Sequence, residues 1–193
     1  MSTQKETQIG VLALQGDFDK HRIALERCGA ATREVRRAAD LNGLDGLVIP
    51  GGESTTIGKL LVRFGLFAPL KDLVTGGLPV YGTCAGLILM AREVTGYAQP
   101  SFACLDAAVS RNAYGRQVES FEADIAVPAL GEEPLCAVFI RAPVVTAVGA
   151  AVEVLARFEN APVLVRQANI LASSFHPELT DDLRVHRYFL GLL

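Results

Sequence analysis

The fold is decided by the stretch Leu78-Pro79-Val80-Tyr81-Gly82-Thr83-Cys84-Ala85-Gly86-Leu87-Ile88-Leu89-Met90. It predicts a short apolar strand, a tight turn that carries one cysteine, and then an apolar helix. Gly82 and Gly86 bracket Cys84 in the pattern Gly-x-Cys-x-Gly, which is the thiol form of a nucleophile elbow. A Cβ at either glycine is expected to clash, because such a turn brings the strand and the helix close together.

Cys84 is expected at the first turn of this helix, where free backbone N–H groups and the helix dipole favour an anion. That position favours the thiolate, which is the nucleophilic form of cysteine. The alternative is an inert buried cysteine, since free cysteines are among the most buried residues. The two glycines make these interpretations about equal, so partners elsewhere in the chain must decide between them.

Length and composition limit the class of protein. The 193 residues fit one domain, residues 1–193, and half of them are hydrophobic, as suits a sheet covered on both faces. The 18 basic and 21 acidic residues give a net charge of −3, without a basic block, and Trp is absent. We therefore expect no nucleic-acid partner.

Cysteine and histidine spacing gives no sign of a metal or a redox centre. The four cysteines form no C-x-x-C pair and the three histidines have no metal-ligand spacing, so we expect no metal and no cofactor. The polar residues 1–8 lack the apolar core of a signal peptide, and no apolar run is long enough to span a membrane. We expect a cytoplasmic protein, in which Cys84 stays a free thiol.

The order of the remaining elements predicts an α/β fold. Strands are expected at residues 9–14, 32–35, 44–50 and 78–81, with helices at 18–28, 57–64 and 67–74. Further short strands are expected at 105–109, 121–127, 135–140, 152–158, 163–166 and 170–175, with a closing helix at 181–193. This rhythm is typical of a three-layer sandwich with a central, mostly parallel sheet flanked by helices. Ligands bind at the C-terminal ends of such strands, where the loops after Leu14, Pro50 and Tyr81 are expected to meet.

The best candidate partners for the thiol lie in Ser174-Phe175-His176-Pro177-Glu178. The residue before a proline favours an extended conformation, in which side chains two residues apart point the same way. His176 and Glu178 would then project into one cleft as a base and the carboxylate that orients it. A surface turn with a solvated Glu178 is the alternative for this motif alone. With Cys84, the set is a nucleophile, a base and an orienting group.

Three other segments are candidates for binding. Gly51-Gly52-Glu53 follows a predicted strand, and its glycines expose backbone N–H groups as an oxyanion hole requires. A phosphate cradle is less favoured because the Gly-Lys-Ser/Thr ending is missing, and a plain turn with Ser54 or Thr55 as the helix N-cap is compatible with either role.

The other two segments carry arginines. Arg111-Asn112-Ala113-Tyr114-Gly115-Arg116-Gln117 is dense in hydrogen-bond donors, or else an exposed loop with solvated arginines. Phe139-Ile140-Arg141-Ala142-Pro143 puts Arg141 at the end of an apolar strand. There it either reaches the surface or faces the cleft, where it would suit a carboxylate-bearing substrate.

Together with Leu12-Ala13-Leu14-Gln15-Gly16 and the run from Pro50 to Gly58, these segments resemble the glutaminase subunits of pyridoxal 5′-phosphate synthase. Those subunits are class I, or triad, glutamine amidotransferases, and the resemblance extends over nearly the whole chain. It implies the catalytic triad Cys84, His176 and Glu178, and an oxyanion hole at Gly52 and Ala85. It further implies that L-glutamine is bound by Gly51, Gly52, Glu53, Arg111, Ile140 and Arg141.

The chain departs from the family's pattern at two places. Tyr114 stands where Phe is expected, and Asp17-Phe18-Asp19-Lys20-His21 differs from the commoner form of that helix start. We expect the second difference to bear on partner contact rather than on chemistry.

The resemblance implies hydrolysis of L-glutamine to L-glutamate and ammonia through a cysteine thioester. The ammonia would pass to a synthase subunit, an oligomeric (β/α)₈ barrel that makes pyridoxal 5′-phosphate (vitamin B6), and the Gln15-Gly16-Asp17 turn is a candidate contact. Two alternatives stay open: the same fold serving another amidotransferase, such as the glutaminase of the histidine pathway, and a redox-sensing or other non-enzymatic module without a triad. The downstream His-x-Glu pair argues against the second.

Overall fold

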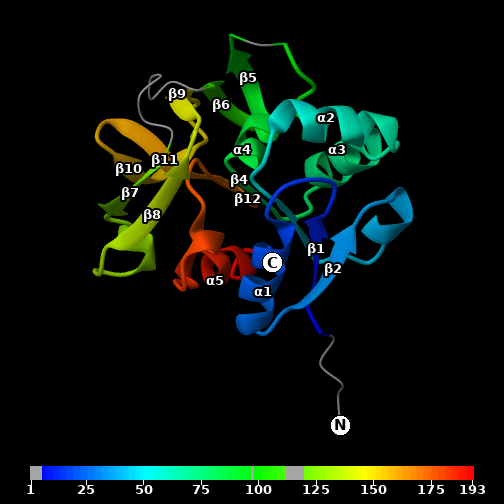
Figure 1. The fold of residues 1–193 in the computed structure, drawn as a ribbon, viewed down its shortest axis with the longest axis horizontal. Helices are drawn as coiled ribbons and strands as arrows, with labels where there is room; N and C mark the ends of the chain where they lie inside the picture. The colour runs from blue at the N-terminus through cyan, green and yellow to red at the C-terminus, as the bar shows by residue number, and fades with distance from the viewer. Residues whose placement is uncertain (1–5, 97, 112–119) are drawn as a thin grey trace.

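The structure is a computed structural model, and it describes residues 6–96, 98–111 and 120–193. The largest sheet of these residues has seven strands in the order β10-β11-β12-β4-β3-β1-β2 (Figure 1). Its strands are β1 Gln8–Leu12, β2 Ala31–Val35, β3 Gly46–Ile49, β4 Val80–Thr83, β10 Glu153–Phe158, β11 Ala161–Gln167 and β12 Ile170–Ser173. The pairs from β2 to β12 are parallel, whereas β11 and β10 join antiparallel at one edge.

Helices cover both faces of this sheet (Figure 1). They are α1 Phe18–Arg27, α2 Ser54–Arg63, α3 Phe67–Thr75, α4 Ala85–Met90 and α5 Arg184–Leu190. Successive strand residues face opposite sides, so Leu47 and Ile49 pack with α2, α3 and α4, whereas Val48 packs with α1 and α5. The two resulting cores confirm the predicted layers of helix, mostly parallel sheet and helix.

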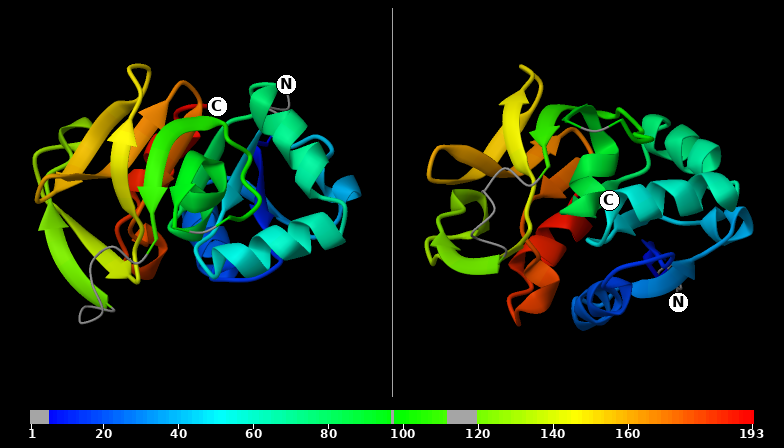
Figure 2. Two further views of the ribbon diagram at one scale, coloured as in Figure 1. Left: turned by 90° about the horizontal axis from the view of Figure 1, so that it is seen from above. Right: turned by 45° about the horizontal axis from the view of Figure 1, so that its top comes forward.

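Smaller elements flank the C-terminal half of the sheet. A three-stranded sheet contains β5 Ala91–Thr95, β6 Leu105–Ser110 and β9 Val144–Val148, and β7 Ser120–Ile125 pairs with β8 Leu135–Ile140. Single 3-10 turns are η1 Ala38–Leu41, η2 Pro128–Leu130 and η3 Pro177–Leu179. The pair β7–β8 lies at the end of the molecule away from α2 and α3 (Figure 2). The helices of the described residues are all too short or too polar to cross a lipid bilayer.

The predicted elements are confirmed to within a few residues, with two omissions. β5 was not predicted because it follows α4 without a turn and its central residues, Arg92 and Glu93, are exposed. β9 was not predicted although its Val-Val-Thr-Ala-Val run is rich in β-branched residues, and only Val145 of this run is buried. The stretch Asn112–Gln117, including Tyr114, lies outside the described residues.

Candidate active site

Loops from several parallel strands meet at one edge of the sheet, as predicted. A Cβ on Gly16, after β1, would overlap the carbonyl oxygen of Gly51, after β3. A Cβ on Gly51 would in turn lie 2.9 Å from Nδ1 of His176, which follows β12. These segments are therefore in direct contact, which brings Gly51 and His176 together although they are far apart in the chain.

Cys84 occupies the sharp turn between β4 and α4. Its φ of 48° and ψ of −96° lie where few residues other than glycine are found. Its N–H donates to the carbonyl of Ser173 on β12, 2.8 Å away, so the neighbouring strand holds the turn in place. Strained residues that the surrounding structure fixes in this way are concentrated at functional sites.

Gly82 and Gly86 allow β4 and α4 to approach one another. A Cβ on Gly82 would lie 2.7 Å from the carbonyl carbon of Gly86, and a Cβ on Gly86 would overlap the carbonyl oxygen of Ile49. These obstacles are backbone atoms, which cannot move aside as the end of the Met90 side chain, also close to Gly82, could. The predicted steric reason for the two glycines is confirmed.

Gly86→Ala is therefore expected to lower the free energy of unfolding by about 1–3 kcal/mol, the usual cost of overpacking, or by more. Gly58→Ala is the matched control, because a Cβ at Gly58 in α2 would have no neighbour closer than 3.6 Å among the residues that the structure describes. Since alanine favours a helix, this variant should gain up to about 1 kcal/mol. Urea unfolding measures both variants, and equal stabilities would contradict the close approach at Gly86.

His176 and Glu178 form a buried pair. Nδ1 of His176 lies 2.8 Å from Oε1 of Glu178, and each residue is 6% exposed. The predicted extended segment was wrong, because residues 177–179 form η3 and His176 is its N-cap. Proline fits the first position of a helical turn, and here this preference decided the conformation. The two side chains meet all the same.

The Cys84 sulfur faces the end of β8. Its Sγ lies 3.9 Å from the carbonyl oxygen of Ile140, and the N–H of His176 donates to Val138 of the same strand at 2.8 Å. Arg141 follows with an exposed side chain and a φ of 43°, another left-handed conformation of a residue that is not glycine. The structure thus brings Ile140 to the cysteine and leaves the Arg141 side chain in solvent.

The charges of the His176–Glu178 pair follow from its partners. Burial lowers the pKa of His176, but hydrogen bonds with Cys84 and Glu178, and the charges of both, raise it to about 10. Burial raises the pKa of Glu178, but the electrostatic interactions with His21 and His176 outweigh burial and hold the pKa well below its usual range. At neutral pH the pair is therefore an imidazolium and a carboxylate.

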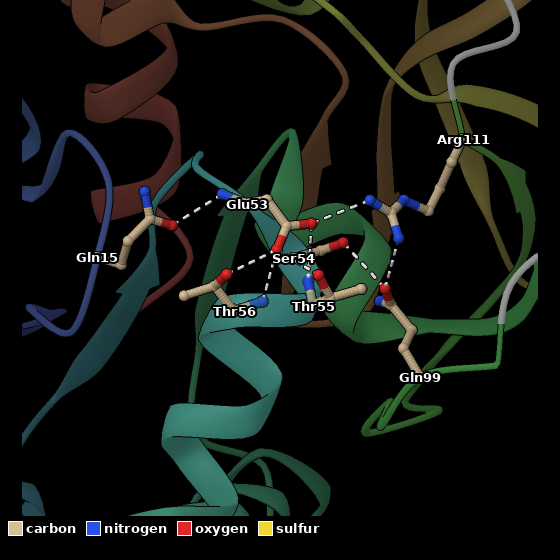
Figure 3. Close-up of polar contacts among 7 residues, drawn as sticks. All are labelled: Gln15, Glu53, Ser54, Thr55, Thr56, Gln99 and Arg111. Carbon is tan, nitrogen blue, oxygen red and sulfur yellow. Dashed lines mark hydrogen bonds and ion pairs between the residues drawn. The ribbon is translucent and has the colours of Figure 1, made fainter.

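Glu53 is the N-cap of α2 (Figure 3). Its carboxylate accepts the backbone N–H groups of Thr55 at 3.2 Å and Thr56 at 2.7 Å. The prediction of Ser54 or Thr55 as N-cap was wrong, because the longer carboxylate reaches both N–H groups. Burial raises the pKa of Glu53, but the hydrogen bonds from Thr55 and Thr56 lower it to about 2.

Glu53 also contacts two residues from other parts of the chain. Its Oε1 accepts from Nη2 of Arg111 at 3.0 Å, so two of the predicted glutamine-binding residues are neighbours (Figure 3). Its N–H donates to Oε1 of Gln15 at 2.8 Å, which ties the turn after β1 to the loop after β3. Gly52, which precedes Glu53 in this loop, has a φ of 154° and is exposed.

Gln99 joins this group, although it was not predicted as a site residue. Its Oε1 accepts from Ser54 Oγ at 2.9 Å and from Arg111 Nη1 at 3.3 Å (Figure 3). Its Nε2 is buried and has no hydrogen-bond partner among the residues that the structure describes. Gln99 lies in an irregular segment without a motif, so no signal in the sequence could have found it.

His21 and His186 were not predicted either, and they lie behind Glu178. Nε2 of His21 is 3.4 Å from Oε2 of Glu178, and Nδ1 of His21 is 3.0 Å from Nε2 of His186. A signal existed for His21, because it lies on the apolar face of its predicted helix with Ala24 and Leu25. The contact with Glu178 shows that His21, at the end of the segment 17–21, lies beside the site; the rest of that segment stays a predicted partner contact.

A metal site is not built here or elsewhere in the described part of the chain, where no group of three or more His, Cys, Asp or Glu side chains could hold a metal ion.

Comparison with known proteins assigns the family. The model of the SNO glutamine amidotransferase family matches residues 11–192. The chain is 60% identical over 183 residues to "Pyridoxal 5'-phosphate synthase subunit PdxT" of Pelotomaculum thermopropionicum, which covers 95% of this chain and 93% of the relative. It is 59% identical over 186 residues to the protein of the same name from Thermus thermophilus, covering 95% of this chain and 96% of the relative.

Solved structures agree. A crystal structure of a glutamine amidotransferase matches with a TM-score of 0.90 at 55% identity, covering 95% of this chain and 97% of that one. The structure of PurLQS from Thermotoga maritima, at 17% identity and a TM-score of 0.66, covers 97% of this chain and 99% of its own, and shares the fold alone. With an elbow cysteine, a buried His–Glu pair and a matching family model, the chain belongs to the SNO glutamine amidotransferase family.

Proposed function

We propose that the chain hydrolyses L-glutamine to L-glutamate and ammonia at Cys84, and delivers the ammonia to a synthase subunit that makes pyridoxal 5′-phosphate. The observation that carries the proposal is the buried His176–Glu178 pair beside the Cys84 elbow, in a member of this family. The synthase is proposed because relatives that are 60% and 59% identical are named as subunits of that enzyme.

In the proposed reaction, the Cys84 thiolate attacks the side-chain carboxamide carbon of glutamine. The backbone N–H groups of Gly52 and Ala85 stabilise the oxyanion of the tetrahedral intermediate. His176 gives a proton to the departing ammonia, which leaves a glutamyl thioester on the sulfur. Water then attacks the thioester and passes a proton to His176, and glutamate leaves as the Cys84 sulfur is regenerated.

Glu178 and His176 divide the work of proton transfer in this proposal. The bond of 2.8 Å between Glu178 Oε1 and Nδ1 of His176 leaves Nε2 as the nitrogen that faces the reacting atoms. The carboxylate also stabilises the imidazolium, so that a proton is at hand when ammonia leaves. A redox-sensing module needs neither group, which favours the hydrolase.

The substrate would be held by Gly51, Gly52, Glu53, Arg111, Ile140 and Arg141. Arg111 matches the α-carboxylate of glutamine and Glu53 matches its ammonium group. The two side chains form an ion pair of 3.0 Å, so a positive and a negative group lie side by side. The ammonium and carboxylate groups of an α-amino acid are also neighbours and could therefore bind one to each. Ile140 contributes its carbonyl near the sulfur, and we propose that Arg141 acts from the rim of the site.

The partner would be an oligomeric (β/α)₈-barrel synthase subunit, and residues 1–193 would act as one glutaminase domain, which we still expect in the cytoplasm. Ammonia must reach the synthase before it takes up a proton and loses its nucleophilicity. The turn Gln15-Gly16-Asp17 is the proposed contact. Because Gln15 bonds the N–H of Glu53, a partner at this turn would act on the loop that carries the oxyanion hole.

The isolated chain is therefore expected to be a poor glutaminase until the synthase binds. Glutamate release, measured with and without the pyridoxal 5′-phosphate synthase subunit, should rise roughly tenfold or more on its addition, a common size for coupling between sites. The synthase of the histidine pathway is the control and should leave the rate unchanged. Full activity of the lone chain, or activation by the control synthase instead, would contradict the proposal.

A further inference from the structure

Four buried titratable side chains lie in a row behind Cys84. The row runs His176, Glu178, His21, His186, with successive distances of 2.8, 3.4 and 3.0 Å between nitrogen and oxygen atoms or between ring nitrogens. They come from η3 and its N-cap, α1 and α5, and they include all three histidines of the chain. His21 and His186 are 0% exposed, so solvent does not reach them.

The carboxylate in this row needs partners for both of its oxygens. An ionised carboxylate that is buried with an unpaired oxygen is costly. His176 bonds Oε1 of Glu178, while Oε2 is buried and has no hydrogen bond among residues 6–96, 98–111 and 120–193. Nε2 of His21 is 3.4 Å from Oε2, which is within ion-pair range.

The protons of the row can be assigned from its two ends. A carboxylate oxygen only accepts, so Nε2 of His21 must carry the hydrogen that faces Glu178 and Thr83, whose Oγ1 is 3.2 Å away. Nδ1 of His21 then accepts from Nε2–H of His186. This leaves Nδ1 of His186, which is buried without a partner among the described residues, as a lone pair rather than as an unpaired N–H.

Two electrostatic effects agree with this assignment. Burial and the neighbouring His21 lower the pKa of His186 to about 3, which keeps its ring neutral. The interaction with His21 is among the causes that hold the pKa of Glu178 below its usual range against the effect of burial. The N–H groups that link the row therefore point toward the carboxylate.

We propose that His21 is a positioning residue, which holds the second carboxylate oxygen of Glu178 so that the first oxygen orients His176. The proposal rests on the proposed role of the Cys84, His176 and Glu178 triad. His21 touches no reacting atom, so its effect passes through Glu178. It also makes α1, whose start follows the Gln15-Gly16-Asp17 turn, part of the support of the active site.

Two polar variants of nearly equal size test this role. In His21→Gln the amide nitrogen can stand where Nε2 stood and donate to Glu178, whereas in His21→Asn the shorter side chain reaches only toward His186. We expect His21→Asn to lower kcat roughly 10- to 100-fold, the usual effect of losing a hydrogen bond to a buried charge, and His21→Gln to keep most of the activity. KM should change little in either variant, because His21 is fully buried behind the triad.

The pH profile separates positioning from simple packing. The groups that face His21 are Glu178 from η3, His186 from α5, and Thr83 and Tyr81 from β4. In His21→Asn the acid limb of kcat/KM should move to higher pH, because Glu178 loses a partner that favours its ionised form. Tyr81→Phe is the control: its hydroxyl bonds Ser173 at 3.0 Å in the same buried cluster, so its loss should reduce stability without moving the limb.

All variants are measured as full chains, with and without the synthase subunit. Equal kcat values and equal acid limbs for His21→Gln and His21→Asn would overturn the positioning role, whether both variants are active or both are impaired. Labelling with a chloroketone analogue of glutamine distinguishes this outcome from failure of the triad. If the unchanged chain forms an adduct at Cys84 and is active, the triad stands and only the role of His21 is lost.

Discussion

Cys84→Ala is expected to abolish glutamine hydrolysis, with a loss in kcat of about 10⁴-fold or more, as removal of a nucleophile costs in related triads. The reason is that the turn between β4 and α4 holds no other thiol to take the glutamyl group. Ser173, at the end of β12, is a poor replacement, because its hydroxyl already donates to the carbonyl of Phe175 at 2.9 Å. Glutamate release in the presence of the synthase subunit measures the loss. Binding of glutamine should persist, because the proposed contacts do not include the sulfur.

Cys104→Ala is the matched control for this variant. Burial raises the pKa of the Cys104 thiol to about 11, so this cysteine stays protonated, and its Sγ lies 3.7 Å from the carbonyl oxygen of Met90, in the core that contains α2, α3 and α4. Its removal should leave kcat unchanged. Substantial glutaminase activity in Cys84→Ala would rule out a thioester on this residue.

Glu178→Gln should lower kcat by up to about 10⁴-fold, the loss seen when the carboxylate of a related triad becomes an amide. It should also change the titration of His176. The pKa of His176 is raised to about 10, partly by the hydrogen bond and charge of Glu178, so the imidazolium persists through neutral pH. Without the carboxylate the ring should lose its proton at a lower pH, nearer the ordinary value of about 6.5.

Nitrogen NMR of the His176 ring across the pH range tests this sign directly. Asp40→Asn is a suitable control, because the pKa of Asp40 is lowered by the backbone N–H of Arg36, in a different part of the fold. It should leave both kcat and the His176 titration unchanged. A His176 transition that stays in place in Glu178→Gln would mean that the carboxylate does not support the imidazolium.

The parts of the site that were predicted depend on short-range chemistry. The glycines at positions 82 and 86, on either side of Cys84, mark a turn at which a strand and a helix pass too close for a Cβ, so the elbow could be predicted from thirteen residues. The pairing of His176 with Glu178 was predicted correctly from a wrong conformation. Pro177 has two local effects. It favours an extended conformation at His176 and the first position of a helical turn at its own position, and the sequence alone does not say which preference prevails.

The parts that could not be predicted depend on how distant elements pack. His21 and His186 are 165 residues apart, and only the docking of α1 and α5 on the same face of the sheet brings them together. Gln99 belongs to the site because the irregular segment before β6 passes beside α2. Glu53 shows a mixed case, since a helix start was expected close to it but the capping residue was not.

The most direct test of the proposed active site is to expose the full chain to the chloroketone analogue of glutamine and to locate the adduct by peptide mass spectrometry. The four cysteines of the chain serve as internal controls for one another. We predict one adduct, at Cys84, whose formation is slowed by glutamine and by Glu178→Gln. No adduct, or modification at Cys28, Cys104 or Cys136 with Cys84 intact, would contradict the claim that residues 84, 176 and 178 form one active site.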